Sequence, residues 1–338
     1  MKRLGQIFII ASAAVLLFWA LPWLVNLITV KPYGTPFTLY SCTVHDFTML
    51  DKSEGHGFRF LDTKGNVYGD EAQPMFYASI LASRGELPDT IEGRPITLAE
   101  IERNAVIISS DPQDVNRPAA PVYLLMESVP ERLELKDPED AMVSRKNSID
   151  IYCMDENRLL EDKTAQLNDA LKEQGFAYPA KVFAGNPSDR KDHDEGYLVA
   201  DSEDKIYKIK QVNGTMEVRH LRQADGLHTK WMLITEFENR ATLGWLVSDE
   251  NRLSILREDG SVVPTEVIFD PGSEDMLAVG DLFYYTIKTS TEEGEHFYAL
   301  RSDDFSLVDT MDRPYPKEWS IPGISFTSGT EASVRPRL

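Results

Sequence analysis

Cysteine is scarce in this chain of 338 residues, and patterns typical of metal ligands are missing. The two cysteines, Cys42 and Cys153, lie 111 positions apart, so the sequence leaves open a disulfide or two separate buried thiols. The six histidines are scattered and form neither HxH nor HxxxH spacing. These absences exclude a zinc site of the Cys/His type, and we expect neither a metal centre nor a cofactor.

Signatures of catalysis are also missing. The chain has no Gly-x-Ser-x-Gly nucleophile elbow and no glycine-rich phosphate-binding loop. Its 55 acidic residues would suffice for a glycosidase pair, but nothing in the sequence brings two of them together. We therefore predict no catalytic residue and a protein that is not an enzyme. A hydrolase on a propeller scaffold stays an alternative.

Positive charge is in deficit. Lysine and arginine number 35 against 55 aspartates and glutamates, which gives a net charge of −20. Such a surface repels nucleic acid and anionic lipid headgroups. Nucleic acid is thereby excluded as a partner, and we interpret the acidity as a means of solubility rather than as a recognition face.

Long apolar runs are limited to one, at residues 7–30. This run carries no charge and is preceded by Lys2 and Arg3 and followed by Lys31. At about 1.5 Å per residue, a helix of this length crosses a hydrocarbon core of about 30 Å. We predict an uncleaved membrane anchor that contacts the lipid bilayer through residues 7–30. A cleavable signal peptide and a buried core helix are the alternatives.

The flanking charges predict the orientation of this anchor. Lys2 and Arg3 favour the cytoplasmic side, and long domains cross a membrane largely regardless of their own charge. We therefore expect a single-pass protein with its main domain outside the cytoplasm. The predicted organisation is a cytoplasmic stub and transmembrane anchor (1–31), a linker (32–37), an extracytoplasmic domain (38–315) and a C-terminal tail (316–338).

Apolar or aromatic runs that end in a turn aspartate recur along the body. The best-matched pair begins at Gly196 and Gly244. The turn positions, to which we assign a structural role, are Asp62, Asp155, Asp201, Asp249 and Asp303. Their gaps are 93, 46, 48 and 54 residues, and Asp111 falls near the missing step in the first gap. A period of about 40–50 residues built on hairpins is typical of β-propeller blades. We predict a mainly β fold, a β-propeller-like array of antiparallel hairpin repeats, with another antiparallel β architecture as the alternative.

Helical patterns interrupt the first half of this array, at about 70–185. Residues 74–84 begin with proline and end before Gly85. Thr97 and Glu100 form a capping box at the start of a second helix. Residues 162–174 form an amphipathic pattern. We predict helical insertions between the β repeats, with a small helical subdomain around residues 70–185 as the alternative.

The loop at residues 186–195 concentrates oxygen ligands. Calcium accepts such ligands, but Arg190 and Lys191 interrupt the loop and the EF-hand spacing is missing. We interpret the loop as a solvated connector.

Several segments together resemble one family. They are Phe58-Arg-Phe-Leu-Asp62, Leu87-Pro-Asp-Thr-Ile-Glu-Gly93, Tyr123-Leu-Leu-Met-Glu-Ser128, Gly196-Tyr-Leu-Val-Ala-Asp201 and Lys208-Ile-Lys-Gln-Val-Asn-Gly214. The chain resembles an uncharacterised family of bacterial membrane-anchored proteins with a domain of unknown function, found beside ABC-transporter components. The resemblance implies a place in the bacterial inner membrane with a periplasmic main domain. It also implies an accessory role in transport, with an ABC transporter permease as partner, and it supplies no catalytic residues.

The functional prediction is accordingly a membrane-anchored extracytoplasmic binding or interaction protein. A sensor or carrier for a small molecule, such as a glycan or a metal, is the alternative beside the hydrolase.

Overall fold

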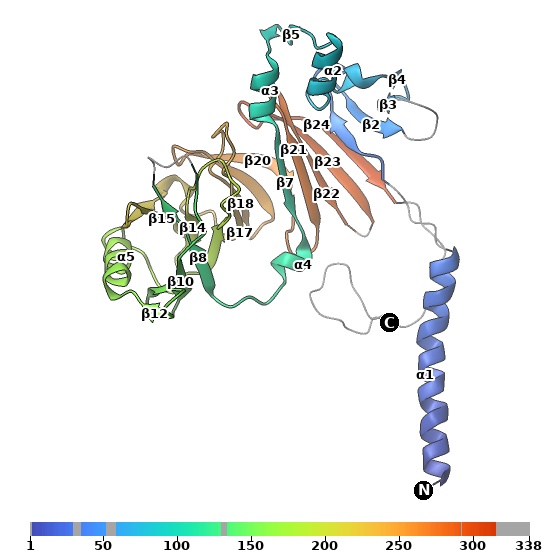
Figure 1. Ribbon diagram of the computed structural model, residues 1–338. Coiled ribbons are helices and arrows are strands. Elements are labelled where there is room, and N and C mark those ends of the chain that lie inside the picture. The colour runs from blue at the N-terminus through green and yellow to red at the C-terminus, as the bar shows by residue number, and fades with distance from the viewer. Residues whose placement is uncertain (1, 30–34, 52–58, 130–133, 292, 316–338) are drawn as a thin grey trace.

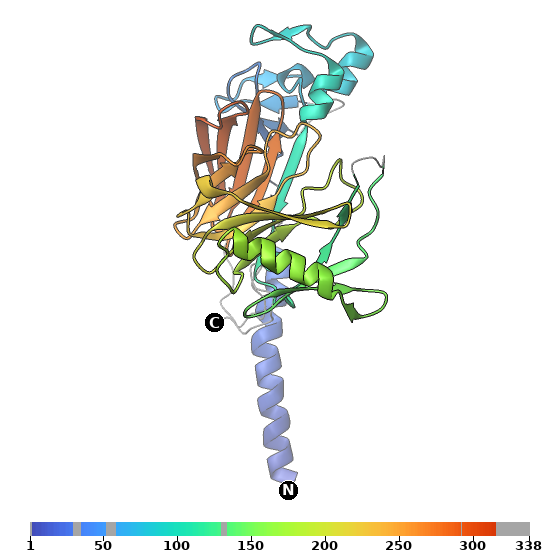
Figure 2. The same ribbon diagram turned by 90° about the vertical axis from the view of Figure 1, so that its left-hand side faces the viewer.

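A long N-terminal helix, α1 (Lys2–Thr29), extends away from a β-rich body (Figures 1 and 2). The computed structural model describes residues 2–29, 35–51, 59–129, 134–291 and 293–315. Large apolar side chains of α1 are exposed over several consecutive positions, at Leu4, Ile7, Phe8, Ile9, Ile10, Val15, Leu16, Leu17, Phe18 and Leu21. Among the described residues, no helix meets the combined length and hydropathy expected of a membrane span. The anchor therefore stays a prediction.

Most strands of the body belong to five antiparallel sheets, which we number in chain order. Sheet 1 contains β1 (Thr38–Tyr40), β2 (Phe47–Asp51), β3 (Arg59–Leu61) and β4 (Val67–Tyr68). Sheet 2 contains β8 (Val122–Leu125), β10 (Asp140–Ser144), β11 (Ile149–Cys153) and β12 (Arg158–Leu159). Sheet 3 contains β13 (Val182–Gly185), β14 (Tyr197–Ala200), β15 (Ile206–Val212) and β16 (Thr215–His220), with β9 (Glu127–Ser128) parallel to β15.

The remaining two large sheets follow the same meander. Sheet 4 contains β17 (Thr229–Ile234), β18 (Gly244–Ser248), β19 (Arg252–Leu256) and β20 (Val262–Ile268). Sheet 5 contains β21 (Asp275–Gly280), β22 (Tyr284–Ser290), β23 (Gly294–Arg301) and β24 (Leu307–Pro314). The earlier strand β7 (Val106–Ser110) pairs with β21 at the edge of sheet 5. A short hairpin of β5 (Thr90–Ile91) and β6 (Arg94–Pro95) lies outside these sheets.

Neighbouring sheets share hydrophobic cores in a continuous series. Sheets 2 and 3 pack together with α5 (Glu161–Glu173), sheets 3 and 4 share a second core, and sheets 4 and 5 share a third around Trp245 and Phe269. Sheet 1 packs on sheet 5 through Phe47 and Phe297, whose ring centroids are 6.1 Å apart. Among the described residues, no hydrophobic cluster contains members of both sheet 1 and sheet 2. The prediction of a mainly β, antiparallel fold is confirmed, whereas a closed propeller is not shown.

The turn aspartates occupy two different kinds of turn. Asp201 and Asp249 follow the second strand of their sheets, at the β14–β15 and β18–β19 turns. Asp62, Asp155 and Asp303 follow the third strand. The turn aspartates are therefore not equivalent positions of one repeat, although the sheets themselves recur. The reason is that an aspartate closes any tight turn by accepting backbone N–H groups, as Asp201 does from Glu203 and Lys205.

The predicted helical insertions are confirmed. They are α2 (Ala78–Arg84), α3 (Leu98–Asn104) and α5, and the Thr97 side chain accepts the N–H of Glu100 at 3.2 Å. Short 3₁₀ turns lie at Asp70–Ala72 and Arg222–Ala224.

A further short helix, α4 (Pro112–Val115), follows β7, and its N-cap is Asp111. Asp111, which the repeat spacing places near the missing step, caps this helix and closes no hairpin. Both cysteines are free thiols, Cys42 buried and Cys153 half-buried.

Two glycines allow a matched test of packing in sheet 3. Gly196 and Gly214 have similar positive φ angles, +74° and +77°. A Cβ at Gly196 would lie 2.2 Å from the backbone oxygen of Ile209, whereas a Cβ at Gly214 meets nothing within 4 Å. We expect Gly196→Ala to lower the free energy of unfolding by about 2–4 kcal/mol and Gly214→Ala by about 1 kcal/mol. Urea denaturation measures both, and equal losses would contradict the close approach.

Candidate functional site

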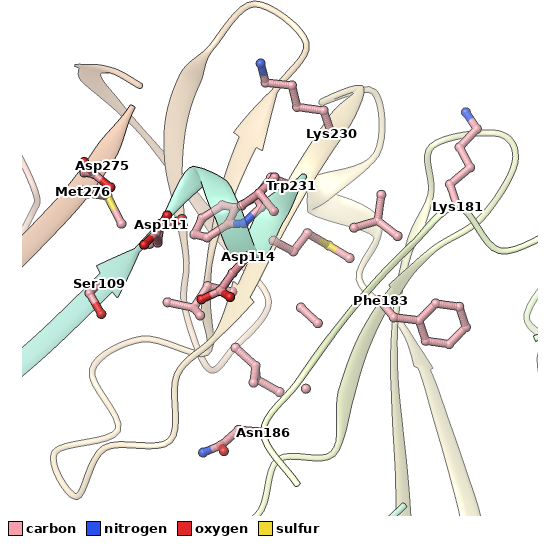
Figure 3. A pocket seen from close by; sticks show the side chains of 18 residues that line it. Ser109, Asp111, Asp114, Lys181, Phe183, Asn186, Lys230, Trp231, Asp275 and Met276 are labelled. Carbon is pink, nitrogen blue, oxygen red and sulfur yellow. The ribbon is translucent and has the colours of Figure 1, made fainter. Parts of the chain in front are cut away.

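A pocket of about 920 Å³ lies where the first strands of three sheets meet (Figure 3). Its walls come from β13 of sheet 3, β17 of sheet 4 and the β7–α4 segment beside β21 of sheet 5. Sheets 3 and 4 are simple meanders, so β13 and β17 are edge strands of their sheets. Strand β7 forms the edge of sheet 5 beside β21. The series of sheets thus places strands from distant parts of the sequence around one open cavity.

Aromatic and aliphatic side chains make up much of the pocket wall. The Phe183 ring is stacked on Tyr123 of β8, with centroids 3.9 Å apart and planes 14° apart. Trp231 packs edge-on against Phe269 at 6.0 Å. Trp231 is half-buried, so part of its surface is available to a ligand, and the contact with Phe269 holds its ring in place before anything binds. The Phe183 ring instead packs on the core of sheets 2 and 3 and points away from the cavity (Figure 3).

Three carboxylates line the side of the pocket formed by sheet 5 and α4. Asp111 and Asp114 belong to the β7–α4 segment, and Asp275 begins β21 (Figure 3). Desolvation and then the negative charge of Asp111 raise the pKa of Asp275. Within the described part of the chain, no basic side chain forms an ion pair within 4.0 Å of any of the three. The positive charge of Lys288 opposes the rise in the pKa of Asp275, but Lys288 forms its ion pair with Glu295. Among the described residues, this wall therefore carries carboxylates that no ion pair neutralises.

The two lysines that line the pocket are held by acids outside its lining. Lys181 Nζ lies 2.6 Å from Asp204 Oδ1, and Lys230 Nζ lies 2.7 Å from Asp270 Oδ1. The hydrogen bond from Lys230 is the main cause of the lowered pKa of Asp270. The positive charges of these two lysines are thus offset by nearby acids. The charge that remains on the pocket lining is negative.

A buried network of charges lies beside Asn186, a pocket residue. Lys191 Nζ lies 2.7 Å from Asp194 Oδ1, 2.7 Å from Glu236 Oε1 and 2.6 Å from the backbone oxygen of Asn186. The Lys191 side chain is 4% exposed, and those of both acids are 2% exposed. Ser128 also donates to Asp194 at 2.5 Å. The network joins the β13–β14 loop to the end of β17.

The interpretation of the loop at 186–195 as a solvated connector is therefore wrong for its C-terminal half. Asp194 and Glu195 are buried, because lysines from the loop and from β15 neutralise them. Lys191, which interrupts the acidic run in the sequence, is the central cation of the network. In the ranges that the structure describes, no group of three or more His, Cys, Asp or Glu side chains is arranged to hold a metal ion.

This network predicts a loss of stability in acid. Burial alone would raise the pKa of Glu195, but hydrogen bonds from His193 and Lys208 outweigh it and hold that pKa at about 2. A folded-state pKa below the ordinary value of 4.5 stabilises the protein above pH 4.5, and this stabilisation is lost as pH falls towards 2. We expect the contribution to be about 2–3 kcal/mol.

Urea denaturation between pH 3 and pH 6 measures this contribution. The free energy of unfolding should fall more steeply with acid in the wild type than in Glu195→Gln. Equal slopes would contradict the assignment to Glu195. Burial raises the pKa of Glu236, which gives a slope of opposite sign, but Glu236 is present in both proteins and its contribution cancels in the comparison.

The five turn aspartates of the predicted repeat do not line the pocket, whereas Asp111, expected near the missing step, does. Asp62 and Asp201 are buried turn-closing residues, and Asp155, Asp249 and Asp303 are exposed. The pocket acids were missed as a group, because β7 and β21 pair across 164 positions between Asp111 and Asp275. A local signal did exist, since an aspartate directly before Pro112 is typical of a helix N-cap.

Comparison with known proteins places this arrangement in a family. Residues 37–300, which hold every element of the pocket, match the family described as "Domain of unknown function (DUF4857)". The chain therefore belongs to this family. No curated protein matches the sequence.

Two solved structures show distant likeness. The structure of the Dos1 propeller shares 13% identity over 53% of this chain and 46% of its own, with a TM-score of 0.31. PorZ, a surface component of the type-IX secretion system of Porphyromonas gingivalis, shares 11% identity over 87% of this chain and 34% of its own, with a TM-score of 0.26. The chain thus covers less than half the length of either, and both likenesses are too weak to define a fold or a function.

Proposed function

We propose that the protein is a membrane-anchored binding protein whose β body presents the pocket outside the cytoplasm. The observation that carries the proposal is the pocket of about 920 Å³ between the first strands of sheets 3, 4 and 5. A concave site with aromatic walls and a few polar groups is what ligand and partner binding requires. The ring of Trp231, held by Phe269, and the carboxylates of Asp111, Asp114 and Asp275 supply both kinds of contact.

The anchor is supported by the exposure of α1. Ile7, Phe8, Ile9 and Ile10 occupy consecutive positions, which point in different directions around a helix, and each is at least 65% exposed. A helix that is apolar all round requires an apolar environment on every side, and a bilayer provides one. The proposed location is the bacterial inner membrane, with Lys2 and Arg3 in the cytoplasm.

The proposed partner is a membrane protein, in particular a permease of an ABC-type transport system. This part follows from the resemblance stated above, and the single anchor supports it because it would keep the body close to such a complex.

Site-specific photocrosslinking in native membranes tests the proposal. A benzoylphenylalanine at position 231, in the pocket wall, is compared with one at position 249, in an exposed turn away from the pocket. We expect a defined adduct from position 231 alone, and a permease in that adduct would support the transport role. Adducts from neither position, or equal adducts from both, would contradict the pocket as the binding site.

A further inference from the structure

One strand edge beside the pocket has no partner strand in the part of the chain that the structure describes. Strand β7 ends the order β24-β23-β22-β21-β7, so among the described residues only its β21 side is paired. Val106 and Ile108 point into the core of sheets 4 and 5. Ile107 is 64% exposed, and Ser109, on the same face by alternation, lines the pocket. A free strand edge of this kind is a ready template for another strand.

The surroundings of this edge are apolar as well as acidic. Val115 of α4 lines the pocket and is 38% exposed. Natural proteins usually protect free edges with lysine or proline, but the five residues of β7 include neither. The strand itself therefore lacks these two forms of protection against strand addition.

The negative charge around this edge determines which side chains are favoured in an added strand. Asp111 and Asp114 follow β7 directly, and Asp275 lies at the start of its neighbour β21. The pocket lysines do not neutralise them, because Lys181 and Lys230 are paired with other acids. A strand added here would place alternate side chains against this acidic wall, where lysine or arginine is favoured.

We propose that the pocket binds an extended basic segment of a partner protein, which adds to the free edge of β7 and pairs its lysine or arginine side chains with Asp111, Asp114 and Asp275. This inference rests on the proposed function, since it specifies what the same pocket binds. Backbone hydrogen bonds supply affinity in this mode, and the acids supply specificity. Binding should weaken as salt concentration rises.

The test uses the full chain in detergent micelles and a fluorescent octapeptide of alternating valine and lysine, followed by fluorescence anisotropy. A valine–glutamate octapeptide controls for charge. A valine–lysine peptide with alternate N-methylated amides controls for strand addition, because it keeps the charge and cannot complete the ladder. We expect the valine–lysine peptide to bind at least tenfold more tightly than either control.

Two protein variants complete the test. The triple variant Asp111→Asn, Asp114→Asn and Asp275→Asn should bind the peptide at least tenfold more weakly, and asparagine retains the N-cap of α4. The matched control replaces the exposed turn acids Asp155, Asp249 and Asp303 by asparagine and removes the same charge away from the pocket. This control should bind like the wild type.

Three outcomes would overturn the inference. Equal binding of the N-methylated peptide would show attraction by charge alone, and equal weakening in both triple variants would show a general effect of net charge. No binding of any peptide would exclude a basic strand. In each case the photocrosslink at position 231 still decides separately whether the pocket binds something else, so failure of the inference and failure of the proposed function are distinguishable.

Discussion

Deletion of residues 1–31 should move the protein from the membrane fraction to the soluble fraction essentially completely. The ten large apolar side chains exposed on α1 would each gain about 1.5–3 kcal/mol on leaving water, far more than a peripheral contact supplies. The wild type should stay in the pellet after an alkaline carbonate wash. A variant in which a cleavable signal peptide replaces residues 1–31 should be exported and recovered as a soluble protein.

This fractionation separates the anchor from its alternatives. Release of the wild type by carbonate would contradict a spanning helix, and retention of the variant in the pellet would show that another part of the chain binds the membrane. Protease added to spheroplasts should degrade the body of the wild type, because the proposed orientation exposes it. Protection of the body would reverse that orientation.

Lys191→Met should lower the free energy of unfolding by about 3–5 kcal/mol. The substitution keeps the volume of the side chain but leaves Asp194 and Glu236 buried without their shared cation. Urea denaturation at pH 7 measures the loss. Lys172→Met, at an exposed position in the last turn of α5, is the matched control and should change stability by less than about 0.5 kcal/mol.

A milder substitution in the same network sharpens this prediction. Glu236 Oε1 accepts from Lys191 and from the backbone N–H of Glu195, whereas its buried Oε2 has no hydrogen-bond partner among the residues that the structure describes. Glu236→Gln keeps the accepting oxygen and should therefore destabilise less than Lys191→Met. A larger loss in Glu236→Gln, or a negligible loss in Lys191→Met, would contradict the central role of the lysine.

The parts of the fold that depend on neighbouring residues were predictable from the sequence. The cap at Thr97, the end of α2 before Gly85 and the amphipathic pattern of α5 each act within one or two turns of chain. Strand content was predictable for the same reason, since alternation and turn chemistry are local.

The pairing of strands was not predictable, because turn aspartates do not record which turn of a sheet they close. Asp201 and Asp303 look alike in sequence and occupy different turns of their sheets. Strand β7 is the extreme case, since it precedes sheet 2 in the chain and pairs within sheet 5.

The candidate site depends on such long-range pairing and was therefore missed. Its acidic wall combines Asp111 with Asp275, and its neighbouring network combines Lys191 with Glu236. The sequence does show each acid, but it gives no measure of which ones the fold leaves without a cation.

The central claim is that the pocket beside β7 is occupied in the native membrane. Hydrogen–deuterium exchange tests it most directly, by comparing the protein in native membrane vesicles with the purified protein in detergent. We predict slower exchange in β7, β13 and β17 in the native membrane and unchanged exchange in β16 and β20, which lie at the opposite edges of their sheets. Identical exchange of the pocket strands in the two states would contradict the claim.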